Sequence, residues 1–270
     1  MKTSDETESI KMLISLAGPL LVGNAIYEIN DIVDKQISSG LGHGGVSVLS
    51  YGASINEIVI IDSYISFNRS FSHYATWIAE GKIEKVGKNL QQSLECLLVI
   101  IMPIMVMCFV AGDLIVGVLY GRGSFSADAI SRTNGVVIGY AAGFFFQAAR
   151  ATIVKVYYAF QDTKTSMING AISVGVNVVL SFTLSKFLGV SGIALATSIS
   201  MFAVTMLLLP GVKKYTPSFS LKSSITDGLK ILLASGIVWF YGACYQSRNT
   251  RNIYLQFVIM GVYIVFLMEH

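Results

Sequence analysis

Charged and amide side chains recur inside the apolar stretches of this chain, and their types and spacing suit the transfer of a polar group or an ion. Glu28, Asp31 and Lys35 are three and four residues apart within the stretch 11–37, which places them on one face of a helix. Asp34 lies on the neighbouring sector. Charge inside a membrane helix is costly, so we expect this face to line a bundle interior or a water-filled cavity. The alternative is that Asp31 and Lys35 only neutralise each other.

Further charged residues stand in two other apolar stretches. Glu57 follows a serine-rich face in the stretch 46–79, where Arg69 belongs to a second polar track. Arg150, in the stretch 130–160, offers a planar guanidinium that suits phosphate oxygens. Pairing with carboxylates or packing against neighbouring helices is the alternative for Arg69 and Arg150. The sequence therefore predicts a substrate cavity lined by Glu28, Asp31, Asp34, Lys35, Glu57, Arg69 and Arg150.

A set of oxygen-bearing side chains suggests a site for a small cation. Asn177 and Ser181 are four residues apart on one helix face, and Thr197 follows across a short turn. A carboxylate from the first helix would complete such a site, so the candidate residues are Asp31, Asp34, Asn177, Ser181 and Thr197. Hydrogen bonding between helices is the alternative role for the amide and hydroxyl groups.

The sequence lacks the motifs of the common catalytic sites. It has three histidines and no HExxH, GxSxG or P-loop pattern, and its three cysteines form no CxxC pair. We therefore predict no catalytic residue, no metal centre and no cofactor other than a coupling cation. A net charge of +3 without a basic tract also argues against nucleic acid as a partner.

The elements that position these residues are membrane helices. The chain has 270 residues, of which 53% are hydrophobic and 13% charged, and this composition suits a bilayer better than water. We expect an all-α, polytopic membrane bundle of about eight transmembrane helices. Their expected ranges are 11–37, 46–79, 86–119, 130–160, 165–188, 190–210, 225–246 and 253–268.

Polar segments and turn residues divide the chain into a tail, a helical lobe, a loop and a terminal helix pair. Residues 1–10 form a polar tail, and 11–210 a six-helix lobe. Residues 211–224 form a polar loop with Pro217, and 225–270 a terminal helix pair. Ser126 and Asp128 indicate a helix start after the glycines of the 120–123 turn. Lys and Arg are more numerous at the ends that share a side with residue 1, so we expect both termini, the tail and the loop in the cytoplasm.

Residues 154–198 read VKVYYAFQDTKTSMINGAISVGVNVVLSFTLSKFLGVSGIALATS, which resembles the matching stretch of the MurJ/MviN family of lipid II flippases. Two further stretches, YGRGSFSADA and INDIVDKQISSGLGHGGVSVLSYG, are similar to a turn and to the start of the second lobe in that family. The matching positions are Tyr158, Ala159, Gln161, Asp162, Thr163, Thr165, Asn177, Gly192 and 194–198.

The resemblance implies a fold of the multidrug/oligosaccharidyl-lipid/polysaccharide exporter superfamily, with two lobes around a central cationic cavity. It implies a multi-pass protein of the bacterial inner membrane that moves an undecaprenyl-pyrophosphate-linked peptidoglycan precursor from the inner to the outer leaflet by alternating access. No covalent chemistry is involved, and membrane lipid surrounds the protein.

This chain departs from the family pattern in three ways. It resembles only the second lobe plus the terminal helix pair, so we expect it to work with a separate N-terminal lobe or a second copy. The family's Arg after Tyr-Ala is missing where this chain reads Tyr51, Gly52, Ala53 and Ser54, and Ser166 replaces a common Pro.

Three other functions stay open at this point. The chain is a scaffold or remnant lobe that does not transport, an exporter of another polyprenyl-linked glycan, or an intramembrane enzyme that acts on the same lipid carrier.

Overall fold

The structure, a computed structural model, describes Gly18, Leu21 and residues 25–26, 28–67, 69–123 and 125–219, and within 61–73 only the backbone. Every regular element in that part of the chain is an α-helix, as the sequence predicts. An N-terminal helical segment covers residues 28–39. The remaining helices are α2 (Gly45–Phe67), α3 (Arg69–Ala79), α4 (Ile83–Tyr120), α5 (Ala127–Ala141), α6 (Phe144–Ala159), α7 (Thr163–Leu188) and α8 (Val190–Tyr215).

Two of the expected helices are divided in the structure. The expected helix 46–79, too long for one straight crossing, is assigned as α2 and α3. The expected helix 130–160 is corrected to α5 and α6, which are bent by 44° at Ala142 and Gly143. The apolar pattern continues through this break, so periodicity alone does not reveal it.

The other ranges agree with the prediction apart from their ends. The expected helices 86–119, 165–188 and 190–210 are found as α4, α7 and α8. α8 continues to Tyr215, so the expected loop 211–224 begins five residues later. The expected tail 1–10 and the helices 225–246 and 253–268 lie outside the described residues.

Several helices have the length and apolarity of membrane spans. Within the described part of the chain, α4, α7 and α8 qualify singly, and the bent pair α5 and α6 qualifies as one further span. The protein is therefore an all-helical membrane bundle.

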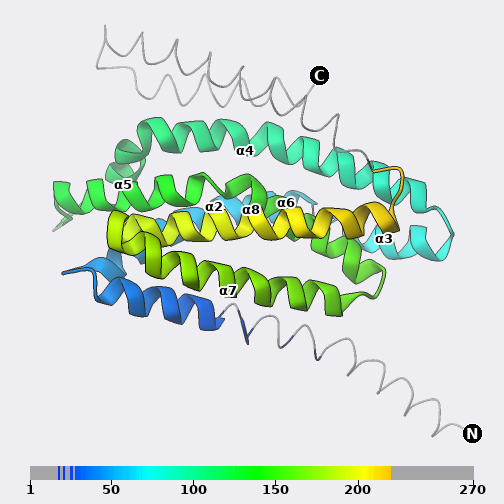
Figure 1. The fold of residues 1–270 in the computed structure, drawn as a ribbon. Helices are drawn as coiled ribbons and strands as arrows, with labels where there is room; N and C mark the ends of the chain where they lie inside the picture. Colours follow the sequence, from blue (N-terminus) through cyan, green and yellow to red (C-terminus); the bar gives the residue numbers. More distant parts are fainter. Residues whose placement is uncertain are drawn as a thin grey trace, which may run out of the picture.

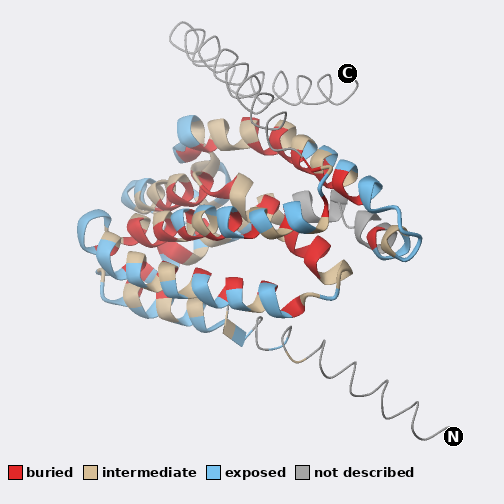
Figure 2. Cartoon of the chain, turned by 45° about the vertical axis from the view of Figure 1, so that its right-hand side comes forward, coloured by how far each residue is buried: buried red, intermediate tan, exposed pale blue. Residues whose placement is uncertain are grey.

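α8 is the central helix of the bundle (Figure 1). It packs against α7, α5, α6 and α2, and α4 covers α5 and α6. The N-terminal segment lies beside α7. Buried residues concentrate on the inner helices, whereas exposed residues lie along the outward faces and at the ends of the helices (Figure 2).

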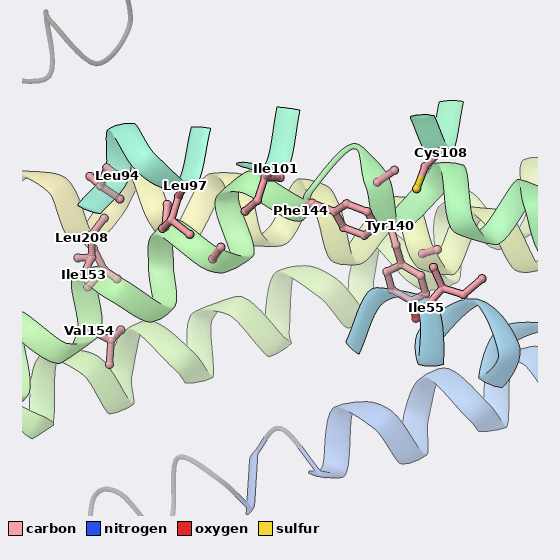
Figure 3. Packing of buried hydrophobic residues seen from close by; sticks show 14 of the residues in the cluster. Ile55, Leu94, Leu97, Ile101, Cys108, Tyr140, Phe144, Ile153, Val154 and Leu208 are labelled. Carbon is pink, nitrogen blue, oxygen red and sulfur yellow. The ribbon is translucent and has the colours of Figure 1, made fainter. Parts of the chain in front are cut away.

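The apolar core is assembled around the bend between α5 and α6. Tyr140 and Phe144 stand on either side of the bend, and Ile55 from α2 and Ile101 from α4 pack near them (Figure 3). Phe144 and Ile101 are fully buried. The bend is thus enclosed by protein rather than exposed to lipid, which is a requirement for irregular backbone at membrane depth.

Polar residues fix the ends of two helices. The Ser126 side chain accepts a hydrogen bond from the Ala129 N–H at 3.2 Å and caps α5, as predicted. Asp162 caps α7 by accepting from the Thr165 N–H at 3.0 Å, and it also accepts from the Tyr215 hydroxyl at 2.9 Å. Partial burial opposes ionisation of Asp162, but the bonds from Thr165 and Tyr215 outweigh it and lower the pKa of this carboxyl.

Gly52 permits the close approach of α2 and α5, and this contact generates a test of the packing. A Cβ at Gly52 would overlap the buried Val136 side chain. We expect Gly52→Ala to lower the free energy of unfolding by about 1–3 kcal/mol through overpacking. Thermal unfolding in detergent measures the change. Gly175→Ala is the matched control, because a Cβ there meets no atom within 4 Å; an equal effect of the two variants would contradict this packing.

Candidate functional site

The buried Asp34 carboxylate is held by side chains from two helical elements. Asp34 is 5% exposed. The Ser181 hydroxyl of α7 donates to Asp34 Oδ1 at 3.0 Å, and the Asn30 amide donates to Asp34 Oδ2 at 3.1 Å. Residues 34 and 181, far apart in the sequence, therefore meet inside the bundle.

Asn177 and Thr197 extend this arrangement to α8. The Asn177 amide donates to Thr197 Oγ1 at 2.9 Å, and Ser181 lies 3.3 Å from Asn177 Oδ1. Four of the five predicted cation-site residues are thus brought together. We call this group, Asn30, Asp34, Asn177, Ser181 and Thr197, the Asp34 cluster.

The sequence of α7 explains why its polar groups face inward. Polar side chains recur every three or four residues on one face of the helix, and all of them are buried, whereas Val179 and Phe182 on the other side are exposed. This polar face consists of Ser166, Asn169, Ser173, Asn177, Ser181 and Ser185. Small hydroxyl and amide groups allow α7 and α8 to pack closely and bond across the interface.

The Asn177 amide has two orientations with different consequences. In one orientation, Asn177 Oδ1 lies 3.3 Å from Asp34 Oδ1 and 3.0 Å from Asn30 Oδ1. Three oxygens facing one another repel unless a proton donor or a cation lies among them. In the other orientation the amide nitrogen donates to both, and Asn177 Oδ1 accepts from the Thr197 hydroxyl and backbone N–H at 2.9 and 3.1 Å.

Asp31, the alternative carboxylate for the cation site, does not join the cluster. Its carboxylate pairs with Lys35 at 2.6 Å, and both side chains are about half exposed. Asp31 therefore lies on the exposed polar face, and of the two predicted carboxylates the structure brings Asp34, not Asp31, to Asn177, Ser181 and Thr197. Its helix position three residues before Asp34 turns it towards another sector.

The exposed face carries three of the predicted cavity residues in addition to Asp31. Glu28, Lys35 and Glu57 are exposed, and the Lys35 ammonium interacts electrostatically with Asp31, Glu28 and Glu57. The first helix and α2 thus contribute to one charged surface. Asp31 and Lys35 form the expected ion pair, and both also belong to this charged surface.

Two cavity candidates, Arg150 and Arg69, remain. Arg150 is partly buried on α6, and the bonds that hold Asp34 come from Asn30 and Ser181 instead. The Arg69 side chain lies outside the described residues. The candidate site is therefore a buried Asp34 cluster next to an exposed charged face.

Asn30 is the one member of the cluster that the candidate cation set omitted. Its spacing of four residues from Asp34 is the signal that identifies it, because residues i and i+4 share a helix face. Within the described residues, no group of three or more His, Cys, Asp or Glu side chains converges. The cluster thus offers hard oxygen atoms rather than the nitrogen and sulfur ligands of a transition-metal centre.

A comparison with protein families matches residues 2–261 to the model of "Lipid II flippase MurJ". The chain belongs to the MurJ family. MurJ proteins are transporters rather than enzymes, which agrees with the lack of catalytic motifs in the sequence.

Curated MurJ relatives are similar at low identity. A probable lipid II flippase MurJ from Bdellovibrio bacteriovorus is 22% identical over 229 residues, 84% of this chain and 44% of that protein. The lipid II flippase MurJ from Thermosipho africanus is 28% identical over 202 residues, 73% of this chain and 41% of that protein. This chain therefore spans about half the length, or less, of the curated relatives it matches.

Solved structures show the same fold. A lipid II flippase MurJ in an inward closed conformation aligns with a TM-score of 0.77 and 25% identity, over 97% of this chain and 54% of that chain. An outward-facing multidrug transporter of the MATE family aligns with a TM-score of 0.68 and 20% identity, over 86% and 54%. The bundle thus corresponds to about half of a MurJ-like or MATE-like transporter.

The Ser181 hydroxyl is the donor that links α7 to Asp34, so its removal tests the cluster. Ser181→Ala leaves a buried carboxylate with one donor fewer, and we expect the free energy of unfolding to fall by about 1–3 kcal/mol. Thermal unfolding measures this loss. Thr183→Ala is the control, because Thr183 is exposed and bonds only its own helix at Val179 O. The cluster assignment would be wrong if Ser181→Ala were no more destabilising than Thr183→Ala.

Proposed function

We propose that this chain forms one half of a lipid II flippase, which moves an undecaprenyl-pyrophosphate-linked peptidoglycan precursor from the inner to the outer leaflet. The observation that carries the proposal is the family match over residues 2–261. The chain spans about half the length of its relatives, and we propose that a further lobe completes the path for the head group. That lobe is a separate N-terminal lobe, a second copy of this chain, or an N-terminal segment of the same protein that precedes this sequence.

The exposed charged face suits the surface that meets the head group. A sugar and pyrophosphate head group needs a polar route through the hydrocarbon, while its lipid tail stays in the bilayer. Glu28, Asp31, Lys35 and Glu57 supply hydrated polar groups on one side of such a route. Their excess of carboxylates leaves the cationic groups that would bind pyrophosphate to the second lobe or to Arg69 and Arg150.

The Asp34 cluster suits a coupling cation. One carboxylate with neutral amide and hydroxyl oxygens matches the ligands of a hard cation, and a single negative charge favours a monovalent ion such as Na⁺. In the amide orientation that needs a cation among the oxygens, Asn177 Oδ1 lies 3.3 Å from Asp34 Oδ1 and 3.0 Å from Asn30 Oδ1. That spacing resembles the edges of a coordination shell, because ligands at about 2.4 Å from an ion lie about 3.4 Å apart at right angles.

A cation in this position would bias the conformational equilibrium. It would join the N-terminal segment, α7 and α8 through one set of ligands, and so favour whichever state brings them together. Binding from one side of the membrane and release on the other would then give direction to alternating access.

We expect Na⁺ to stabilise the protein relative to choline, which is too large for the cluster. At a concentration ten times the Kd, the gain in unfolding free energy is about 1.4 kcal/mol. Asp34→Asn should abolish the gain because it removes the only carboxylate of the cluster. Thermal unfolding in NaCl and choline chloride measures this effect.

Asp31→Asn is the matched control for the cation site. It removes an exposed carboxylate from the same helix, and the Na⁺ effect should remain. The proposed cation site is refuted if Asp34→Asn keeps the Na⁺ effect, or if Asp31→Asn loses it instead.

The transport proposal is tested by complementation of cells depleted of their own lipid II flippase. We expect growth and surface-exposed lipid II to recover when this chain is expressed with a separate MurJ-type first lobe. Rescue by this chain alone would support a flippase assembled from two copies. Failure in both arrangements, with the chain present in the membrane, would contradict transport and favour a scaffold.

A further inference from the structure

The bend between α5 and α6 is held by a hydroxyl from another helix. In an unbroken α-helix the Gly143 N–H would bond the Gly139 carbonyl, but here it bonds the Tyr140 carbonyl at 2.9 Å. The Ser198 hydroxyl of α8 donates to the Gly139 carbonyl at 2.6 Å and lies 3.2 Å from the Tyr140 carbonyl. A side chain thus replaces the backbone donor that the bend removes.

α8 is in close contact with both arms of the bend. A Cβ at Gly143 would lie 2.5 Å from Ser198 Oγ, and a Cβ at Gly139 would lie 2.8 Å from the Ala194 Cβ. On the α6 side, the Thr205 hydroxyl lies 3.1 Å from the Phe146 carbonyl. α8 therefore contacts the last turn of α5 and the first turn of α6 through small and hydroxyl residues.

The residue next to Ser198 belongs to the Asp34 cluster. Thr197 bonds Asn177 on α7, whereas Ser198 bonds α5, because consecutive residues project about 100° apart around a helix. One turn of α8 thus contacts both the cluster and the bend.

Asn177 bonds this turn of α8 in either orientation of its amide. In one, Thr197 Oγ1 accepts from the Asn177 amide. In the other, both the Thr197 hydroxyl and the Thr197 backbone N–H donate to Asn177. Asn177 therefore joins the cluster to the turn of α8 that carries Ser198, and a displacement of Asn177 acts on that turn.

We propose that the α5–α6 bend is a hinge, and that consecutive residues Thr197 and Ser198 of α8 couple its angle to the state of the Asp34 cluster. A change at the cluster alters the turn of α8, shifts the Ser198 hydroxyl relative to the Gly139 carbonyl, and lets the two arms change their angle. Only the binding of a cation to the cluster rests on the proposed function. The contacts between the cluster, α8 and the bend do not depend on it.

The test measures the distance between the beginning of α5 and the end of α7. Spin labels are placed at Ser131→Cys and Lys186→Cys, both exposed, after Cys96, Cys108 and Cys244 are replaced by alanine. Residues 131–143 span about 18 Å of helix, so complete straightening of the 44° bend would swing Ser131 by about 13 Å. We expect a shift of several ångström between NaCl and choline chloride, and its loss in Ser198→Ala.

Ser200→Ala is the matched control for Ser198→Ala. Ser200 is equally buried on α8, but within the described residues its hydroxyl bonds the Thr197 carbonyl of its own helix, at 2.8 Å, and no other helix. The Na⁺-dependent shift should persist in Ser200→Ala. If Ser198→Ala keeps the full shift, or if Na⁺ stabilises the protein without any shift, the coupling is wrong.

A comparison with Asp34→Asn separates this inference from the proposed cation site. If Na⁺ neither stabilises the protein nor changes the distance, the cation proposal fails, and the distance in choline chloride then decides the coupling. A shift caused by Asp34→Asn that disappears in the Ser198→Ala background would uphold the coupling without a bound ion. The absence of such a shift would overturn it.

Discussion

Burial of the Asp34 carboxylate among membrane helices is the constraint on which the rest of the site depends. A buried carboxylate is unfavourable unless donors or a cation compensate for the lost water. The N-terminal segment supplies Asn30, and α7 supplies Ser181. Asn177 then links the group to Thr197 on α8. Three elements are therefore positioned by one charged side chain.

A second constraint is that every backbone group inside the bundle needs a partner. The bend of α5 and α6 would leave the Gly139 carbonyl without its helical donor, and Ser198 supplies one. The glycines of α5 and the small residues of α8 allow the two helices to approach closely enough for this bond. α8 therefore stabilises an irregular segment on one side and the Asp34 cluster on the other, which explains its central place in the fold.

Much of the fold could be predicted from the sequence because long apolar runs and their polar connections are local signals. The ranges of α4, α7 and α8 follow from these signals, and the Ser126 cap follows from its helix-start pattern. The α5–α6 bend could not be predicted, because it depends on a hydroxyl more than fifty residues later in the chain.

The candidate site could be predicted only in part from the sequence. Helical spacing identified Asn177 and Ser181 as neighbours, and Asp34 as a carboxylate near them. Spacing within one helix could not decide between Asp31 and Asp34, because the rotation of that helix relative to α7 determines which one is buried. Lys35, four residues after Asp31, indicated that Asp31 forms an ion pair within its own helix.

The proposed cation site requires that Asp34 is ionised and that a bound cation balances its charge, and infrared difference spectroscopy between NaCl and choline chloride can detect this state. The account predicts that Na⁺ perturbs a carboxylate stretching band, and that this band is missing in Asp34→Asn and retained in Asp31→Asn. A spectrum in which Asp34 appears as a protonated carboxyl in both salts, with no band sensitive to Na⁺, would contradict the account.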